Sequence, residues 1–517
     1  MSTSDGLPTA GTRRLITISV MSASLMISLD TTIANVALPH IQGSVSASQD
    51  EISWMLTSYI VAQAIVTPLT GWLAAQLGRK RLMVLAVTGF TIASALCGIA
   101  TNIGELVTFR LLQGAMGATL VPLGQAVLLD IYPKEQHGQA MATWSMGVVL
   151  GPVIGPVLGG WLTDSLSWRW VFFINLPIGV LSVIGLSASM TGSRDAKRPQ
   201  IDFMGFAMLS LAIGSLQLVL DRGQTKDWFG SLEVCIEAGA TLLFGYMAAV
   251  HTVTARRSFI NLSLFSDRNF VVGSLLGFFI GPVLFGVLAL LPTMLEDLLG
   301  YPVTTAGLAM APRGLGTFIA MTMMGKLLKR IDARILISGG FIMIGAAMYR
   351  MSGFSLGMDQ RLIMTSGFVQ GLGIGMVYVS LTTVAFATLD SRYRNDGTAM
   401  FSLIRNIGSS VGISILQVMT VRNAAIVHAR LAESIGPDNP NLAYSLPDFD
   451  FNLPASVAQL NAEITRQAGM VSYIDAFWAL FIMAIAVTPL LILIQPPGKA
   501  ATPVPGSRGT DSSKSEA

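Results

Sequence analysis

The stretch LITISVMSASLMISLDTTIANVAL, residues Leu15–Leu38, decides the class of fold. It is long enough to cross a bilayer, which takes about 20 residues at about 1.5 Å of rise per residue. Its only ionisable side chain is Asp30, and a carboxylate at that depth costs roughly 2.5–3.5 kcal/mol on insertion scales. Asp30 therefore needs a partner, a wet cavity or a proton. It either couples transport to a proton gradient or serves as a structural ion pair between helices.

The composition indicates an all-α polytopic membrane protein. Of the 517 residues, 52% are hydrophobic and 12% are charged, about half the charged share of a soluble domain. The mean hydropathy is +0.63, which excludes a soluble enzyme. Lipid leaves only helices or closed barrels as spanning structures, and these runs are too long and too apolar for barrel strands. The net charge of +3 gives no indication of nucleic-acid binding. Cys97 and Cys235 form no metal or redox spacing, so we expect no metal site and no cofactor.

The apolar runs predict fourteen spanning helices. Their approximate cores are residues 15–38, 52–75, 82–101, 105–129, 137–162, 168–190, 201–220, 231–252, 270–292, 304–327, 333–352, 360–388, 397–420 and 472–495. With the N-terminus placed in the cytoplasm, cytoplasmic segments hold 21 of the 32 Lys and Arg residues, outer segments hold eight and helices hold three. This asymmetry predicts that both termini are cytoplasmic.

A faint internal repeat predicts two related halves. Gln113-Gly114 corresponds to Gln370-Gly371, and HGQAM (His137–Met141) corresponds to DGTAM (Asp396–Met400). Transporters with such repeats place the substrate site at the interface of the halves. We therefore divide the chain into four parts: a six-helix bundle (1–195), two inserted helices (196–262), a second six-helix bundle with an outer loop at 421–470 (263–496), and a disordered cytoplasmic tail (497–517).

Four motifs resemble those of one transporter family. They are LDTTIANVALPHI (Leu29–Ile41), RLLQGAMG (Arg110–Gly117), GVVLGPVIGPVLGG (Gly147–Gly160) and WRWVFFINLPIG (Trp168–Gly179). Together they resemble the major facilitator superfamily, more narrowly its fourteen-helix drug/proton antiporters of the EmrB/QacA type. LDRGQTKDWF (Leu220–Phe229) is similar to the EmrB branch. The resemblance implies a major facilitator fold of two six-helix bundles plus two inserted helices.

The resemblance also implies roles for polar residues inside the helices. Asp30 and Arg110 lie at compatible depths and are expected to pair, with Asp30 carrying the coupled proton and Arg110 influencing its protonation. The alternative is a static structural pair. Asn35, Gln113 and Arg405 are expected to line the substrate cavity. The other intramembrane cation, Arg313, is expected to approach a lipid head group or a neighbouring helix.

The glycine-rich motif has a physical logic of its own. Glycines recur every four residues and therefore share one helix face, which lets another helix approach closely, while the prolines bend the helix. The residues are Gly147, Gly151, Pro152, Gly155, Pro156, Gly159 and Gly160. In the family this pattern marks antiporters and is thought to seal the central cavity against proton leak. The alternative is ordinary small-residue packing.

A second motif, GWLAAQLGRKR (Gly71–Arg81), resembles the family's cytoplasmic gating loop. Its glycines and cations are present at Gly71, Gly78, Arg79 and Lys80, but Ala75 replaces the usual acidic residue. We therefore consider two roles for the basic residues of this loop equally: gating of the transport pathway, and simple anchoring of the loop on the cytoplasmic side of the membrane.

These observations favour a proton-coupled antiporter that exports hydrophobic or amphiphilic compounds by alternating access. The alternative is a proton-coupled importer of a small polar solute, against which the glycine motif argues. No GxxxxGK[ST] or HExxH motif supports an ATPase or a metalloprotease. The expected surroundings are the lipid bilayer of a bacterial inner membrane and small amphiphilic substrates. The resemblance adds a periplasmic adaptor protein and an outer-membrane channel as partners.

Overall fold

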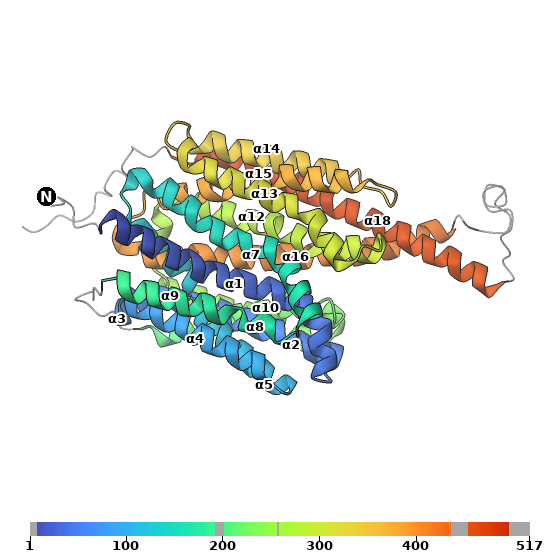
Figure 1. Cartoon of the computed structure of the whole chain (residues 1–517), viewed down its shortest axis with the longest axis horizontal. Helices are drawn as coiled ribbons and strands as arrows, with labels where there is room; N and C mark the ends of the chain where they lie inside the picture. The colour runs from blue at the N-terminus through green and yellow to red at the C-terminus, as the bar shows by residue number, and fades with distance from the viewer. Residues whose placement is uncertain (1–7, 192–200, 256–257, 434, 436–452, 496–517) are drawn as a thin grey trace, which may run out of the picture.

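The computed structural model describes residues 8–191, 201–255, 258–433, 435 and 453–495, and the predicted tail at 497–517 lies outside this range. Within it, every regular element is a helix, and most helices run roughly along the long axis of the molecule (Figure 1). We call the end at which α1 begins the inner end and the opposite end the outer end.

The first half of the chain supplies six spans. Three of them are broken into two or three consecutive helical pieces. The elements are α1 (Ala10–Ser44), α2 (Gln49–Val66) with η1 (Thr67–Leu69) and α3 (Thr70–Leu77), α4 (Arg79–Ile99), α5 (Ile103–Gly117) with α6 (Leu120–Ile131), α7 (His137–Ser165), and α8 (Trp170–Phe173) with α9 (Asn175–Ser189).

The second half follows the two inserted helices α10 (Phe203–Arg222) and α11 (Leu232–Thr254). Its elements are α12 (Arg268–Thr293) with the π-helical turn η5 (Met294–Leu298), α13 (Val303–Leu327), α14 (Ala333–Met351), α15 (Gln360–Ala385), α16 (Arg394–Glu433) and α18 (Pro454–Val487) with η7 (Thr488–Leu493). The two motifs of the internal repeat occupy matching places, since HGQAM opens α7 and DGTAM lies in the first turns of α16.

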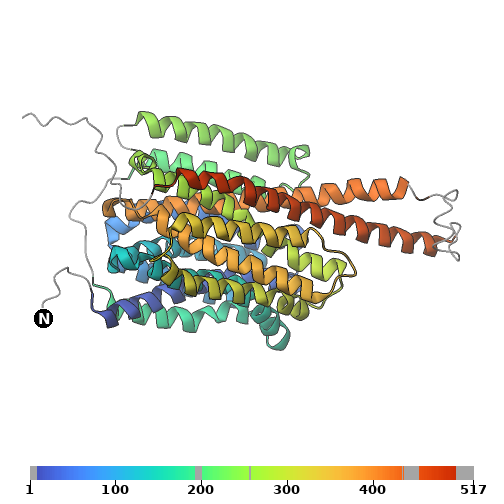
Figure 2. The ribbon, with the colours of Figure 1, turned by 90° about the horizontal axis from the view of Figure 1, so that it is seen from above.

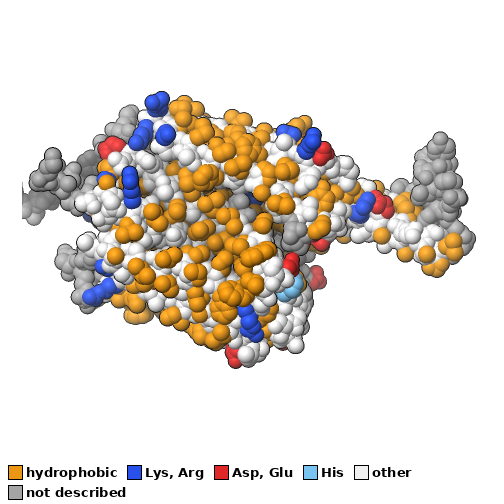
Figure 3. All heavy atoms as spheres, in the orientation of Figure 1, with side chains coloured by type: hydrophobic (Ala, Val, Ile, Leu, Met, Phe, Trp, Pro, Cys, Tyr) orange, Lys and Arg blue, Asp and Glu red, His pale blue; other side chains and the backbone are white. Residues whose placement is uncertain are grey.

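Twelve described helices are long and apolar enough to span a membrane, and α7 adds a thirteenth that is bent by 41° where 137–152 meets 154–165. The 25-residue α13 occupies the remaining position between α12 and α14. The structure is thus compatible with fourteen spans. Figure 3 shows hydrophobic side chains over the middle of one face and charged side chains gathered toward the two ends.

Local sequence explains where these helices begin. Ser48 and Glu51 form a capping box at the start of α2, in which each side chain satisfies a free N–H of the other residue. Asp267 and Asp359 accept backbone N–H groups at the starts of α12 and α15, where a carboxylate also complements the helix dipole. Gly78 joins α3 to α4 with a φ of +82°, a conformation that glycine adopts without a steric penalty.

The segment predicted as an outer loop at 421–470 differs from expectation. α16 continues to Glu433 and α18 already begins at Pro454, so both flanks of this segment are helical. These helical ends project side by side beyond the rest of the molecule, at the end opposite the N-terminus (Figure 2). Asn423 donates to Asp475 and His428 contacts Asn461 between the two helices. Residues 436–452 lie outside the described range.

Candidate functional site

Asp30 lies at the centre of a buried polar network within the first half. Its side chain is 1% exposed, as is that of Arg110. Arg110 Nη1 donates to Asp30 Oδ2 at 2.6 Å, and Gln113 Nε2 donates to Asp30 Oδ1 at 2.8 Å. Asn175 Nδ2 donates to the same Oδ1 at 2.9 Å. α1, α5 and α9 thus converge on one carboxylate, and all its partners donate, as an ionised carboxylate requires.

Arg110 has partners besides Asp30. Its Nη1 donates to Gln113 Oε1 at 2.8 Å, and its Nε donates to the Met55 carbonyl at 3.3 Å. Its guanidinium lies 4.2 Å from the centre of the Tyr59 ring, a separation at which a cation is attracted to the ring face. Arg110 is thus held by groups of α2 and α5 as well as by Asp30 of α1.

Asn175 is a member of this network that the sequence did not single out, although it lies within the quoted motif WRWVFFINLPIG. Its Nδ2 also donates to Ser94 Oγ at 3.0 Å, while its Oδ1 is buried without a hydrogen-bond partner in the described part of the chain. Rotation of the amide by 180° would present Oδ1 to Asp30. Asn175 can therefore donate to the carboxylate or accept from the carboxylic acid.

The glycine face of α7 packs directly on α1, the helix that carries Asp30. A Cβ placed on Gly147, Gly151 or Gly155 would lie 2.6, 2.5 or 2.1 Å from side-chain atoms of Met21, Ser28 or Thr32, respectively. Such distances are too short for any side chain on those glycines. A Cβ on Gly159 would lie 3.1 Å from Ile33 Cγ2, a tight contact that a small shift could relieve. The glycines thus set the separation between α1 and α7 at the level of Asp30.

Pro152 of α7 and Ser28 of α1 act together at this contact. Pro152 has no N–H, so it leaves the carbonyl of Val148, four residues earlier, without its helical partner. Ser28 Oγ donates to that carbonyl at 2.5 Å. The Ser28 hydroxyl of α1 therefore supplies the hydrogen bond that the Val148 carbonyl of α7 cannot obtain from water inside a membrane. Ser28 lies two residues before Asp30.

The opposite side of α7 borders a small cavity of about 20 Å³ between the two halves. Val148, Val149 and Pro152 line it from the first half. The second half contributes α12, α13 and α15, and most of the lining is apolar. The cavity has room for about one water molecule. Its position between the halves and near the middle of these helices is where transporters of this architecture hold substrate.

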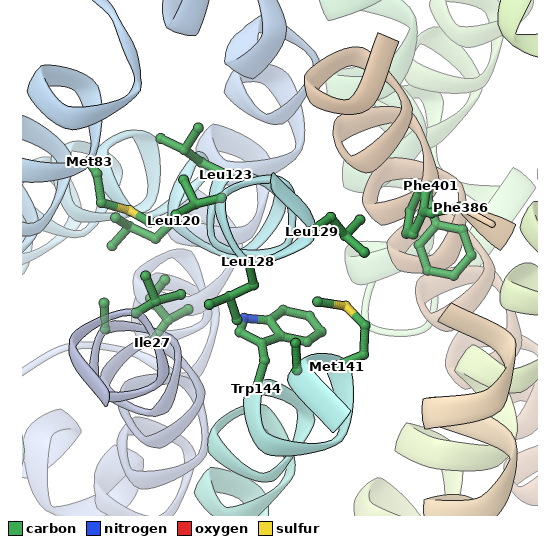
Figure 4. Close-up of a cluster of buried hydrophobic side chains, with 14 of the residues drawn as sticks. Ile27, Met83, Leu120, Leu123, Leu128, Leu129, Met141, Trp144, Phe386 and Phe401 are labelled. Carbon is green, nitrogen blue, oxygen red and sulfur yellow. The ribbon is translucent and has the colours of Figure 1, made fainter. Parts of the chain in front are cut away.

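Arg405 lies near this interface but does not line the cavity. It is 6% exposed and donates through Nη1 to the hydroxyl of Tyr378. Tyr378 stacks on Trp144 of α7, with ring centres 6.4 Å apart, and Trp144 Nε1 donates to Ser24 Oγ at 3.0 Å. A chain of contacts thus runs from the second half to α1. In Figure 4, Trp144 lies within a buried apolar cluster that extends to Phe386 and Phe401 of the second half.

The inner ends of the two halves are held together by charges. Asp130, at the end of α6, forms ion pairs with Arg79 of α4 and with Arg394 of α16. Arg79 Nε also donates to Asn395 Oδ1 at 3.1 Å. A Cβ on Gly71 would lie 1.7 Å from Asp396 Oδ1, so only glycine allows this approach. The loop that has Ala75 in place of the usual acid thus finds a carboxylate partner in Asp130, which also links the two halves at the inner end.

The remaining predicted site residues lie in several different places. Asn35 is exposed on α1, beyond the Asp30 network. Gln113, expected in the substrate cavity, is instead fully buried against Asp30. Lys80 donates to the Ser187 carbonyl at 2.7 Å and so joins α4 to α9. Gly160 is buried, and Pro156 is half-buried on α7.

The charged side chains at the outer ends of the inserted helices pair with one another or contact α2. Arg222 pairs with Glu233 at 2.5 Å and with Glu237 at 3.4 Å, and its guanidinium lies over the Trp54 ring at 4.5 Å. Asp221, which the sequence reading missed, accepts from the Thr57 hydroxyl. These contacts fasten α10 to the first half at the outer end.

The fold and the site define a multi-pass membrane transporter with a cavity between two halves. The chain belongs to the major facilitator superfamily, whose family profile matches residues 20–413. It is 36% identical over 486 residues to the multidrug export protein EmrB of Haemophilus influenzae, covering 93% of this chain and 94% of that protein. It is 36% identical over 491 residues to the fatty acid resistance protein FarB of Neisseria gonorrhoeae, covering 93% and 96%.

Solved structures agree on the fold. The proton:xylose symporter XylE superposes with a TM-score of 0.63 at 12% identity, covering 94% of this chain and 97% of that one. At that identity the likeness concerns the fold alone. The predicted family and fold class are thereby confirmed, and the family is one of transporters rather than enzymes.

Proposed function

We propose that this protein is a proton-coupled antiporter that exports hydrophobic or amphiphilic compounds across a bacterial inner membrane. Support comes from its relatives, which are named multidrug export proteins at about 35% identity over most of the chain. The apolar cavity between the halves suits such substrates. A polar-solute importer would need more polar groups around the cavity than Arg313 and Thr317 supply.

The mechanism rests on one observation: the Asp30 carboxylate is buried and accepts hydrogen bonds from Arg110, Gln113 and Asn175. Asp30 is the proton carrier in this proposal, and Arg110 is its counter-charge. Protonation removes the charge that holds Arg110, whose remaining partners are Gln113, Met55 and Tyr59. Neutralising a buried ion pair changes the energy of helix packing by several kcal/mol. The network can therefore respond to one proton with a change in how α1, α5 and α9 pack.

α7 connects the proton site to the substrate cavity. One side of this helix lines the cavity through Val148 and Pro152, and its glycine face packs on α1 beside Ser28. A substrate that displaces α7 would displace Ser28, two residues from Asp30. The contact between α1 and α7 is thus the physical link between the two sites.

The orientation and partners are part of the same proposal. We place the inner end in the cytoplasm, since it carries most of the Lys and Arg residues. The projecting ends of α16 and α18 then lie in the periplasm. They offer a surface for the adaptor protein that would lead to an outer-membrane channel. An impermeant thiol reagent should label a cysteine placed at Val457 in intact spheroplasts of a strain whose protein carries Cys235→Ala.

Export from everted vesicles tests the function. Vesicles that contain the protein should accumulate an amphiphilic dye when a pH gradient, acidic inside, is imposed, and should lose it when the gradient collapses. One proton moved through 100 mV supplies about 2.3 kcal/mol, which is enough to drive accumulation. Accumulation that is unchanged without a proton gradient would contradict the proposal.

A further inference from the structure

One charge at the cavity has no role in the proton pathway described above. Arg313 of α13 is 5% exposed and lines the cavity between the halves. Its Nη2 donates to the Leu284 carbonyl of α12 at 2.6 Å. Its Nη1 is buried and has no hydrogen-bond partner among the described residues. Arg313 takes part in none of the ion pairs formed within the described ranges, in contrast to Arg110, which pairs with Asp30.

The backbone around Arg313 keeps this cation in place. A Cβ on Gly371 of α15 would lie 1.9 Å from the Arg313 carbonyl oxygen, and one on Gly375 would lie 2.7 Å from the Thr317 carbonyl oxygen. α13 and α15 are therefore in backbone contact at this level. The guanidinium is held at the cavity wall and cannot withdraw by a movement of α13 alone.

The surroundings make an unpaired cation costly. Apart from Thr317, the other lining residues are apolar, among them Pro152, Phe285 and Ile374. A buried charge is stable only when it is paired and hydrogen-bonded. The second buried cation of this half, Arg405, likewise bonds to Tyr378 and Asn406 rather than to a carboxylate. Among the described residues, neither buried arginine of the second half pairs with a carboxylate, and Arg313 presents its charge to the cavity.

We propose that Arg313 determines the specificity of the transported substrate by binding its anionic head group. The substrate class is then a singly charged amphiphilic anion, with a carboxylate or a similar acid at the guanidinium and an apolar body against the apolar walls of the cavity, which must widen to admit it. The planar guanidinium fork matches a carboxylate better than it matches any neutral group. A neutral amphiphile would leave Nη1 unsatisfied, and a cationic one would be repelled. This inference rests on the proposed export function, because it assigns the cavity to the substrate.

Equilibrium binding to the full-length protein in lipid nanodiscs tests the inference without a proton gradient. The probes are radiolabelled dodecanoate and dodecyltrimethylammonium, which share an apolar chain and differ in the sign of the head group, with empty nanodiscs subtracted. The wild type should bind dodecanoate more tightly. Arg313→Gln should weaken dodecanoate binding about tenfold or more, which corresponds to about 1.4 kcal/mol. The same change should leave the cationic probe unaffected or bound more tightly.

Two variants serve as controls. Arg313→Lys keeps the charge but loses the planar fork, so it should retain part of the preference for dodecanoate. Arg350→Gln removes an exposed arginine of α14 that contacts Thr365, and it should change nothing. Should Arg313→Gln fail to fold, Ile374→Phe, which narrows the cavity and keeps the cation, should weaken dodecanoate binding instead.

The inference is overturned if the wild type binds the cation as well as the anion, or if a folded Arg313→Gln protein binds dodecanoate like the wild type. Failure of the export function would look different. In that case the vesicle assay would show no proton-driven accumulation, while anion binding would still depend on Arg313.

Discussion

The hydroxyl of Ser28 donates to the carbonyl of Val148 at 2.5 Å, the carbonyl that Pro152 leaves without its helical partner. This bond, together with those of Trp144 to Ser24 and of Thr32 to Gly151, joins the helix of the proton site to a helix of the cavity wall. It also explains why α7 tolerates Pro152 inside a membrane, because the Val148 carbonyl, which has no helical N–H partner, accepts a hydrogen bond from a neighbouring helix.

Ser28→Ala should therefore destabilise the protein by about 1–3 kcal/mol, the cost of leaving a buried acceptor unsatisfied, and should weaken proton-driven export. Thermal unfolding of the purified protein and vesicle transport measure the two effects. Ser19→Ala is the matched control, because Ser19 Oγ donates to the Leu15 carbonyl within its own helix. Equal effects of the two substitutions would show that the Ser28 contact has no special role.

Gly151→Ala tests the close contact between α1 and α7. The new Cβ would lie 2.5 Å from Ser28 Cβ, so the helices must separate at the level of Asp30. We expect lower thermal stability and loss of proton-driven export. Gly239→Ala on α11 meets no atom within 4 Å and should stabilise its helix by up to about 1 kcal/mol. An active, stable Gly151→Ala protein would argue against the proposed role of the glycine face.

Asp130→Asn tests the charges that close the inner end. The substitution weakens the ion pairs to Arg79 and Arg394, so the inner ends should separate more often. Distances between spin labels on α6 and α16, measured by pulsed EPR, should show a larger population at long separation. Asp359→Asn is the control, since Asp359 is exposed at the opposite end of the molecule and accepts the Arg361 N–H at the start of α15. An unchanged distance distribution in Asp130→Asn would mean that apolar packing alone closes this side.

The inserted helices are expected to lie outside the transport pathway. Glu233 and Glu237 pair with Arg222 at the outer end of α10, and no hydrogen bond among the described residues joins them to Asp30 or Arg110. The double substitution Glu233→Gln, Glu237→Gln should leave export largely intact in vesicles, with at most a modest loss of thermal stability. Loss of proton coupling at normal expression would place a proton carrier on these helices.

The sequence predicted the fold because lipid permits few solutions, and a long apolar run is a helix in almost any context. It also predicted that Asp30 and Arg110 could meet, since both lie at similar depth. It could not predict Asn175 as a third partner, because an isolated amide in an apolar motif gives no signal of what it faces. The Asp130–Arg394 pair joins residues far apart in the chain, and only the packing of the halves brings them together.

The placement of Arg313 illustrates the same limit. The sequence left a lipid head group and a neighbouring helix open as its contact, and Arg313 does donate to the Leu284 carbonyl of the neighbouring α12. Depth alone does not tell which face of a helix meets lipid and which meets the other half. The backbone contacts of Gly371 and Gly375 fix that rotation, and they place Arg313 at the cavity.

The central claim is that Asp30 carries the coupled proton. Asp30→Asn alone would leave the Arg110 charge buried without its partner, at a cost of about 3–5 kcal/mol. The double substitution Asp30→Asn, Arg110→Gln removes both charges and should be more stable than Asp30→Asn alone, so it serves as the folded reference.

The most direct measurement is proton release from the purified protein on addition of substrate, recorded with a pH indicator in weakly buffered detergent solution. The wild type should release protons. The folded double variant should still bind substrate but release none, and its vesicles should not accumulate dye on a pH gradient alone. Substrate-evoked proton release and uphill accumulation by that variant would contradict the account. In that case Asp30 is structural, and Glu296 and Asp297 become the next candidates for the proton carrier.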